Sequence, residues 1–258
     1  MILVDKNPYI VDFGAGLVRQ IAALTPRYGG DIEELEIKNL KTAFLTHMHS
    51  DHTVGYPDLI LTPWVMGRDT PLNVYGPAGI TEMTEHILNA YQDDIKYRVY
   101  GLEPTNDTGW RVNAHEIQAG IIYEDALVKV EAFPVRHGSW QNAYGFRFTT
   151  ADKVIVISGD TIPCDNIIKY SQGADILIHE VYCKKAFEKK NTAWKRYHSA
   201  NHTSTYQLAE LAGKINPGLL ILYHTLFWDC SEREVLNEIA TQGYHGKVVV
   251  GADLQIYE

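Results

Sequence analysis

The sequence predicts an α/β fold in which helices are layered on mixed β-sheets. Apolar runs with strand character alternate with amphipathic helical patterns at both ends of the 258-residue chain, around a strand-rich centre. Polar residues of metal-binding or acid–base type recur directly after several of the apolar runs. Such a recurrence is typical of α/β proteins, which bind ligands where their strands end.

Strands are predicted where β-branched, aromatic or apolar runs are bounded by Gly, Pro, Asn or Asp. These runs lie at residues 2–4, 9–11, 43–45, 71–75, 96–100, 112–117, 127–134, 144–149, 154–158, 175–179, 219–223, 247–250 and 254–257. The runs at 154–158 and 175–179 are apolar almost throughout, which is typical of strands buried on both faces.

Helices are predicted where apolar residues recur at a spacing of three to four. These patterns lie at residues 17–24, 54–66, 79–91, 163–170, 204–214 and 231–241. Residues 182–201 are highly charged and helical in part, and residues 32–40 form a weakly helical or looped stretch. No linker rich in Pro, Gly or Ser divides the chain, so residues 1–258 are predicted to form one domain.

The composition indicates a globular protein without a membrane span. The net charge of −9 disfavours a broad nucleic-acid surface, although it leaves room for a local basic groove. No apolar run has the length of a membrane span and the N-terminus lacks the pattern of a signal peptide, so we expect a cytoplasmic protein. Three cysteines, Cys164, Cys183 and Cys230, are odd in number and widely separated. We therefore expect no disulfide framework, in keeping with a reducing compartment.

A dense group of metal-ligand residues follows the predicted strand at 43–45. Within six consecutive positions lie His47, His49, Asp51 and His52. Neutral imidazole and carboxylate are good zinc ligands. Because the group follows a strand, it would lie on a loop that a rigid element holds in place.

Later strands end in residues that complement this group. His137 follows the strand at 127–134, Asp160 follows 154–158, and Glu180 follows 175–179. His224 follows the strand at 219–223. One such residue is usually only a strand reaching the surface, but the repetition indicates a common site.

These motifs resemble the ligand pattern of the metallo-β-lactamase superfamily of dinuclear metallohydrolases. The pattern consists of His47-x-His49-x-Asp51-His52, a lone His137, Gly159-Asp160-Thr161 and His224. His179-Glu180 and His202-Thr203-Ser204 further resemble its ribonuclease Z-like and arylsulfatase-like branch. The resemblance covers nearly the whole chain and implies the αββα sandwich, two mixed sheets with helices outside.

The resemblance also implies a site with two Zn²⁺ ions. It assigns one ion to His47, His49 and His137, and the other to Asp51, His52 and His224, with Asp160 bridging them. Mixed nitrogen and oxygen ligation suits zinc best, with Mn²⁺ or iron as alternatives. Two such metals lower the pKa of a bound water from 15.7 to roughly 7, which produces hydroxide at neutral pH.

Three residues are candidates for the proton transfers of hydrolysis. Asp51 is expected to orient the nucleophile and accept its proton while it binds metal. His202 is the candidate proton donor to the leaving alkoxide, and Glu180 is expected to hold its tautomer and raise its pKa. Helix capping by Thr203 and Ser204 is the alternative role for this segment.

Other histidines and aromatic residues have weaker support. His198 is predicted either to line the pocket or to be solvated, and a further set is expected to be structural or on the surface: His86, His115, His179 and His245. Four aromatic residues flank ligand positions and are candidates for an apolar pocket wall, although core packing is the more usual role: Trp140, Tyr144, Phe227 and Trp228.

Two departures from the resembling enzymes bear on the substrate. Asp160 follows His137 by only 23 positions (160 − 137), enough for a β-hairpin but not for the long basic arm with which short ribonuclease Z enzymes grip tRNA. The usual first strand and its Gly-rich loop do not precede residues 2–4. Both the missing arm and the charge of −9 point away from tRNA.

The leading prediction is therefore a two-zinc hydrolase of a small or medium-sized ester, most of all a phosphodiester or an aryl sulfate. The first alternative is a ribonuclease Z-like endonuclease that processes tRNA 3′ ends, and a lactone or β-lactam hydrolase is a further one. A metal-binding protein without turnover is the alternative outside enzymes. We expect a small-molecule substrate, no membrane partner, and a homodimer if the chain assembles.

Overall fold

The computed structural model of the protein describes residues 1–258, which divide into two compact units. The N-terminal unit comprises Met1–Ile117 with Ile256–Glu258, and the C-terminal unit comprises Gln118–Gln255. Each unit contains one mixed β-sheet with its own helices and its own hydrophobic core. No helix of the protein has both the length and the apolar character that a bilayer span requires.

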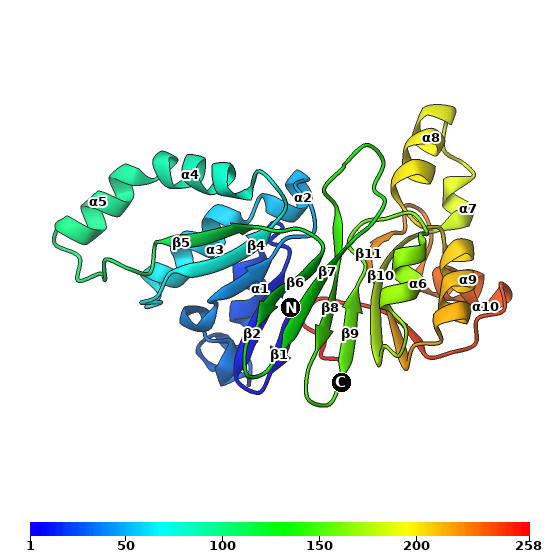
Figure 1. Ribbon diagram of the computed structural model, residues 1–258, viewed down its shortest axis with the longest axis horizontal. Coiled ribbons are helices and arrows are strands. Elements are labelled where there is room, and N and C mark those ends of the chain that lie inside the picture. Colours follow the sequence, from blue (N-terminus) through cyan, green and yellow to red (C-terminus); the bar gives the residue numbers. More distant parts are fainter. The chain divides into compact units, whose positions relative to one another are not determined.

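The N-terminal unit is built on a five-stranded sheet with the order β1-β2-β3-β4-β5 (Figure 1). Its strands are β1 (Ile2–Val4), β2 (Asn7–Val11), β3 (Thr42–Phe44), β4 (Leu72–Gly76) and β5 (Val112–Glu116). Its helices are α1 (Leu17–Ala23), α2 (Ser50–Thr53), α3 (Tyr56–Val65), α4 (Ile80–Ala90) and α5 (Gln92–Tyr100), with short 3₁₀ turns at Pro26–Tyr28, Glu33–Leu35 and Ile37–Asn39. β1 and β2 are antiparallel, and the strands from β2 to β5 are parallel.

The C-terminal unit is built on a seven-stranded sheet with the order β12-β11-β10-β9-β8-β7-β6. Its strands are β6 (Gly120–Glu124), β7 (Lys129–Pro134), β8 (Tyr144–Thr149), β9 (Val154–Ile157), β10 (Ile176–Tyr182), β11 (Leu219–Leu226) and β12 (Val248–Val250). Its helices are α6 (Asp165–Tyr170), α7 (Lys184–Phe187), α8 (Thr192–Asn201), α9 (Thr205–Ile215) and α10 (Glu232–Thr241). The strands from β9 to β12 are parallel, whereas β6 to β9 are antiparallel neighbours.

The core of the C-terminal unit forms where α6, α9 and α10 cover the parallel strands (Figure 1). Leu208 and Leu211 of α9 are buried together with Leu177 of β10 and Leu220 of β11. Each fully buried leucine contributes roughly 1.5–3 kcal/mol through removal of apolar surface from water. This packing holds the parallel strands rigidly, so the residues at their ends have fixed positions.

Two predicted strands are wrong. Residues 96–100 belong to helix α5, where Asp94 and Arg98 form a helical ion pair of 3.0 Å and Tyr97 is 69% exposed. The alternation of apolar residues there buries only Ile95, so it does not mark the face of a strand. Residues 254–257 form no strand, and Leu254 lies in a turn with a φ of +67°. In addition, β6 was not among the predicted strands.

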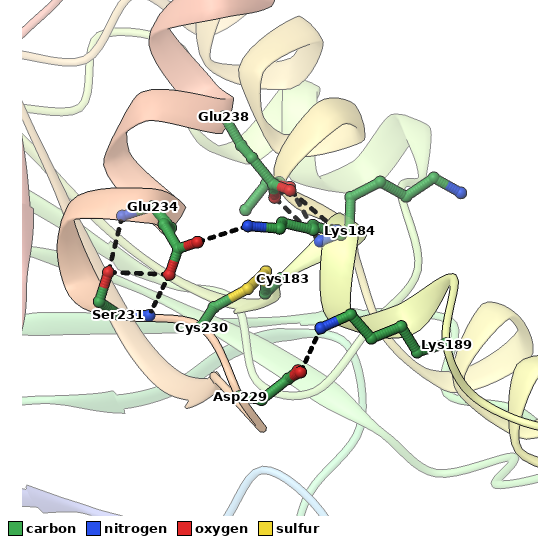
Figure 2. The surroundings of a disulfide bond; sticks show 10 residues. Cys183, Lys184, Lys189, Asp229, Cys230, Ser231, Glu234 and Glu238 are labelled. Carbon is green, nitrogen blue, oxygen red and sulfur yellow. Dashed lines mark hydrogen bonds and ion pairs between the residues drawn. A yellow bond between two sulfur atoms is a disulfide. The ribbon is translucent and has the colours of Figure 1, made fainter.

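The cysteines were expected to form no disulfide framework, but Cys183 and Cys230 are bonded, with their Cα atoms 6.5 Å apart (Figure 2). The two residues are 47 positions apart in sequence, yet each follows one of the neighbouring parallel strands β10 and β11. Only the sheet order brings them together. Cys164 remains a free thiol.

Candidate metal centre

The His47–His52 group lies where two parallel strands of the N-terminal unit end. β2 and β3 pair with Val11 opposite Phe44, and the backbone N–H of Asp12 continues this ladder to the carbonyl of Phe44 at 2.8 Å. The chain after β3 forms the histidine loop and then the short helix α2, and the chain after β2 begins with Asp12. The two strand ends therefore place Asp12 beside the histidine loop.

Asp12 orients two of the predicted ligands. Its Oδ2 accepts from Nδ1 of His52 at 2.8 Å and from the hydroxyl of Thr46 at 2.9 Å, and its Oδ1 accepts from the backbone N–H of Thr46 at 2.8 Å. Because the Thr46 hydroxyl donates to Asp12, it accepts from Nδ1 of His47, which lies 3.0 Å away. With Nδ1 donating to these oxygens, Nε2 is the nitrogen of each ring that would face a metal.

The remaining ligands of this unit lie next to His47 and His52. Nε2 of His47 lies 2.9 Å from Nδ1 of His49, and the His47 and His52 rings are 4.2 Å apart. Two nitrogens bound to one tetrahedral zinc are roughly 3.4 Å apart, so the first pair has nearly the required spacing. Oδ2 of Asp51 lies 3.6 Å from Nε2 of His52, on a side chain that is 62% exposed.

A close backbone approach fixes α2 against the turn after Asp12. A Cβ atom added at Gly14 would lie 2.4 Å from the carbonyl oxygen of Asp51, and one at Gly55 would lie 2.2 Å from the carbonyl oxygen of Gly14. Only glycine fits at these two positions. The loop and the helix that carry His49, Asp51 and His52 are thus held by backbone contacts.

In the C-terminal unit, neighbouring strands deliver the other predicted residues. His137 follows β7, Asp160 follows β9 after a turn at Gly159 with a φ of +61°, and Glu180 lies in β10. His137, Asp160 and Glu180 are all buried. One potential ligand atom from each of His137, Asp160 and His202 lies within 4.8 Å of the other two.

His224 is displayed by a bulge in β11. Glu180 of β10 pairs with Tyr223 and Val181 pairs with Thr225, so His224 is the extra residue between two regular pairs. Its φ of +46° lies in the left-handed region, which histidine adopts rarely. The bulge places Nε2 of His224 3.6 Å from Oδ2 of Asp160. β11 continues to Leu226, past the predicted end of the strand at residue 223.

His137 is held by the C-terminal end of α8. Its Nδ1 donates to the carbonyl oxygen of Asn201 at 2.8 Å, and the next residue, Gly138, donates its backbone N–H to Ala200 at 2.9 Å. Gly138 has a φ of +55°, and a Cβ atom there would lie 2.1 Å from Oδ1 of Asn201. As in His47 and His52, the bond to Nδ1 leaves Nε2 available to a metal.

Glu180 joins two loops through one buried carboxylate. Its Oε1 accepts from the backbone N–H of Thr203 at 2.9 Å and of Thr161 at 3.2 Å. Its Oε2 lies 3.5 Å from Nδ1 of His202. Burial raises the pKa of the Glu180 carboxyl to about 7, and its contacts with His202 oppose this rise. Glu180 and His202 therefore lie side by side in the buried part of this unit.

His202 lies in the short link between α8 and α9. Its Nδ1 faces Oδ2 of Asp160 at 3.9 Å as well as Glu180, and its ring is stacked on that of His224 at 5.8 Å. The capping role belongs to Ser204, whose hydroxyl accepts from the backbone of Gln207 in a capping box. His202 itself contributes only its backbone N–H to the end of α8.

The other histidines and the aromatic residues near the predicted ligands differ in burial and in contacts. His198 is buried between Trp194 and Trp228, where burial and then the positive charges of His202 and Lys190 lower its pKa to about 4. Tyr144 is buried within β8, and Trp140 lies beside His137 with 36% of its surface exposed. Of the histidines expected to be structural or on the surface, His179 is fully buried and His86 and His245 are exposed, while His115 stacks on Tyr75.

Sequence reasoning missed Asp12 and Asn201, which orient ligands without being ligands themselves. Asp12 had a recognisable signal, because it follows a predicted strand in an Asp-x-Gly turn. Asn201 had none, because it acts on His137 through its backbone carbonyl.

The donor set passes a simple test for a divalent metal. Three histidines direct Nδ1 to oxygen acceptors, so that Nε2 is the nitrogen that would face a metal, and the buried carboxylate of Asp160 lies near two further imidazoles. Neutral imidazoles oriented by such acceptors are typical of zinc sites, whereas a purely structural cluster needs no common orientation. The His and Asp clusters of both units are therefore suited to divalent metal binding.

The chain matches the family described as the β-lactamase superfamily domain over residues 7–225. It is 31% identical over 222 residues to a ribonuclease Z of Mycobacterium sp. (strain KMS), covering 85% of this chain and 74% of that protein. A ribonuclease Z of Mycobacterium bovis is 28% identical over 262 residues, covering 100% of this chain and 90% of the relative.

Solved structures share the fold at lower identity. A metallo-β-lactamase fold protein from Bacillus subtilis superposes with a TM-score of 0.72 at 19% identity, covering 98% of this chain and 88% of that chain. The short form of human tRNase Z superposes with a TM-score of 0.70 at 18% identity, covering 100% of this chain and 90% of that chain. Zn²⁺-bound PqqB from Methylobacterium extorquens superposes with a TM-score of 0.63 at 17% identity, covering 98% of this chain and 84% of that chain.

The predicted fold class is thereby confirmed. Two mixed sheets with their own helices, a family match over most of the chain and close structural neighbours all agree. The chain belongs to the metallo-β-lactamase superfamily of hydrolases, among the relatives of ribonuclease Z.

Proposed function

We propose that this protein is a two-zinc phosphodiesterase that cleaves RNA in the manner of ribonuclease Z. The observation that carries the proposal is the 31% identity, over 85% of the chain, to a relative named ribonuclease Z. The buried Glu180–His202 pair supports it, because a phosphodiester with an alkoxide leaving group needs a proton donor.

The proposed ligands are those that the sequence predicted. His47, His49 and His137 would hold one zinc ion, Asp51, His52 and His224 would hold the other, and Asp160 would be a shared ligand. The Nδ1 contacts of His47, His52 and His137 support this assignment, since each leaves Nε2 as the donor atom. When bound, the metals supply a water of low pKa and stabilise negative charge on the phosphate oxygens.

Residues of the protein would carry out the two proton transfers of hydrolysis. Glu180 is fixed by the backbone of Thr161 and Thr203, so its free oxygen holds His202 in one orientation. With Nδ1 directed to Glu180, the other ring nitrogen of His202 is the one that donates a proton to the departing oxygen. Asp51, whose side chain is exposed at the start of α2, would accept the proton that the nucleophile releases.

RNA is favoured over a small ester by the named relatives. The low charge and the 23-position interval between His137 and Asp160 favour a small substrate. However, those features concern how a long substrate is held, whereas the identity to relatives named ribonuclease Z extends over most of the chain. The alternative expectation of a ribonuclease Z-like enzyme thus has more support than the leading one.

A direct test offers the zinc-loaded protein a precursor tRNA with a 3′ trailer, beside an aryl phosphodiester and an aryl sulfate. We expect cleavage at the trailer junction and slower turnover of the aryl phosphodiester, with neither reaction in Asp160→Ala. Turnover of the small esters without any cleavage of RNA would overturn the RNA assignment. Absence of turnover on both phosphodiesters would overturn phosphodiester hydrolysis itself.

A further inference from the structure

We propose that a groove between the His137 loop and α8 binds the backbone phosphates of single-stranded RNA next to the scissile bond, through Arg136 and Arg196. The inference rests on the proposed function and adds where the substrate strand runs. It concerns only the C-terminal unit, which contains every residue of the groove.

The groove has the size of a ligand site. Its volume is about 680 Å³, within the range of roughly 300–1,000 Å³ that is usual for small-ligand pockets. It is lined by Arg136, Gly138, Ser139, Ile162, Ala193, Arg196, Tyr197, Ala200 and Asn201. No carboxylate lies among these residues, although the chain carries a net charge of −9.

The two arginines are the available cations of this region. Residues 182–201 contain six basic residues and one acidic residue, a net charge of +5. Most of the lysines are engaged: Lys184 and Lys195 pair with Glu188, and Lys185 pairs with Glu234. Lys189 pairs with Asp229 (Figure 2). Arg136 and Arg196, by contrast, are exposed and form no ion pair. Guanidinium groups bind phosphate oxygens through paired N–H donors.

Aromatic rings beside the arginines suit an unpaired strand. Tyr197 lines the groove and is 42% exposed, and Trp194, one turn earlier on α8, is 53% exposed. Proteins that bind single-stranded RNA combine a basic groove with exposed rings on which bases stack. This combination favours a nucleotide strand over a free inorganic anion, which has no base to stack.

The groove lies next to His137, to which two of its lining residues are connected through their backbone. Asn201 is one of the residues that line the groove, and its carbonyl accepts from Nδ1 of the ligand candidate His137. Arg136 is the residue directly before His137. A strand with one phosphate at Arg136 therefore has its neighbouring phosphodiester close to His137, as cleavage requires.

The test compares Arg136→Gln, Arg196→Gln and the double variant with Arg233→Gln, which removes the same charge from an exposed, unpaired arginine of α10. Binding of a fluorescent single-stranded oligoribonucleotide is measured by anisotropy in an Asp160→Ala background, which prevents cleavage. We expect each single variant to weaken binding roughly tenfold and the double variant more strongly. The slope of log Kd against log salt should fall by about 0.7 for each arginine.

Turnover separates this inference from the proposed function. In the otherwise unchanged zinc enzyme, the double variant should raise KM for precursor tRNA at least tenfold, yet change kcat/KM for an aryl phosphodiester less than twofold. Arg136→Lys with Arg196→Lys should restore most of the RNA affinity because the charges remain.

If the double variant binds RNA as Arg233→Gln does, with the same salt slope, the groove is not the RNA site. An equal loss on both substrates would also contradict it, because it would mean that the substitutions disturb His137. If wild-type enzyme cleaves neither substrate, the proposed function fails, while the anisotropy measurement still decides the groove.

Discussion

At the scale of single residues, Asp12 controls the orientation of His52 directly and of His47 through Thr46. We expect Asp12→Ala to weaken metal binding by about 10–100-fold, the usual effect of losing an acceptor behind a ligating histidine. Competition with a chelator measures this affinity. Asp31→Ala, at an exposed carboxylate of the same unit, is the control and should leave the affinity unchanged. Equal affinities in the two variants would show that Asp12 has no part in metal binding.

His202 is the candidate proton donor, and Asp160 and Glu180 both lie near its Nδ1. As a proton donor, it should lower turnover of RNA by roughly 10²–10⁴ when replaced by alanine and leave metal content unchanged. The loss should be much smaller for an aryl phosphodiester, because an aryl leaving group needs little protonation. Elemental analysis beside kinetics tests this, and loss of metal from His202→Ala would make it a ligand instead.

At the scale of elements, the disulfide joins the start of α7 to the segment after β11 (Figure 2). It closes a loop with a sequence separation of 47, for which the chain-entropy model gives about 4 kcal/mol of stabilisation. We expect the double variant Cys183→Ala/Cys230→Ala to lose up to this amount in urea unfolding. Reduction of the wild-type protein should produce the same loss, and Cys164→Ala should not. Unfolding curves that do not change on reduction would contradict the bond.

Buried polar contacts also decide how the elements near the disulfide are joined. The Glu238 carboxylate of α10 accepts from the backbone N–H groups of Lys184 and Lys185 at the start of α7 and from the hydroxyl of Thr205 at the start of α9. A carboxylate is favourable at the N-termini of helices, where backbone N–H groups lack partners within the helix. The starts of α7 and α9 are therefore joined to α10 by a residue that no motif marks.

At the scale of the whole molecule, buried titrating groups make stability depend on pH. Burial lowers the pKa of His179 from 6.5 to about 4. Between these values the unfolded chain binds a proton that the folded protein does not, so this group lowers the free energy of unfolding as pH falls from 6.5 to 4. Above 6.5 its contribution is constant. Glu180 acts in the opposite sense. Its pKa is raised from 4.5 to about 7, so the folded protein binds a proton that the unfolded chain does not, and the free energy of unfolding rises as pH falls from 7 to 4.5.

His179→Gln removes only the first contribution, so the difference between the two proteins isolates it. We expect the unfolding free energy of wild-type protein to fall more steeply between pH 6.5 and 4 than that of His179→Gln, measured by chemical denaturation. His245→Gln, at an exposed histidine, should follow the wild-type curve. Parallel curves for wild type and His179→Gln would mean that His179 titrates normally.

The sequence by itself was enough to predict most elements, the fold class and the family, because these depend on periodicity and on ligands close together in the chain. His47, His49, Asp51 and His52 are recognisable since one loop carries them all. Short apolar strands such as Val154–Ile157 are equally local signals. The error at residues 96–100 has the same origin, because alternation alone does not show which face of an element is buried.

The tertiary structure decided what depends on neighbours distant in sequence. The Cys183–Cys230 bond requires β10 and β11 to be adjacent, and the bulge at His224 appears only in the register of those two strands. The supporting roles of Asp12, and of Asn201 through its carbonyl, require strand and helix ends to meet. Sequence patterns report which face of an element is apolar, whereas partners across the fold are set by packing and backbone geometry. The Arg136–Arg196 groove belongs to this second kind, since residues 60 positions apart (196 − 136) line it together.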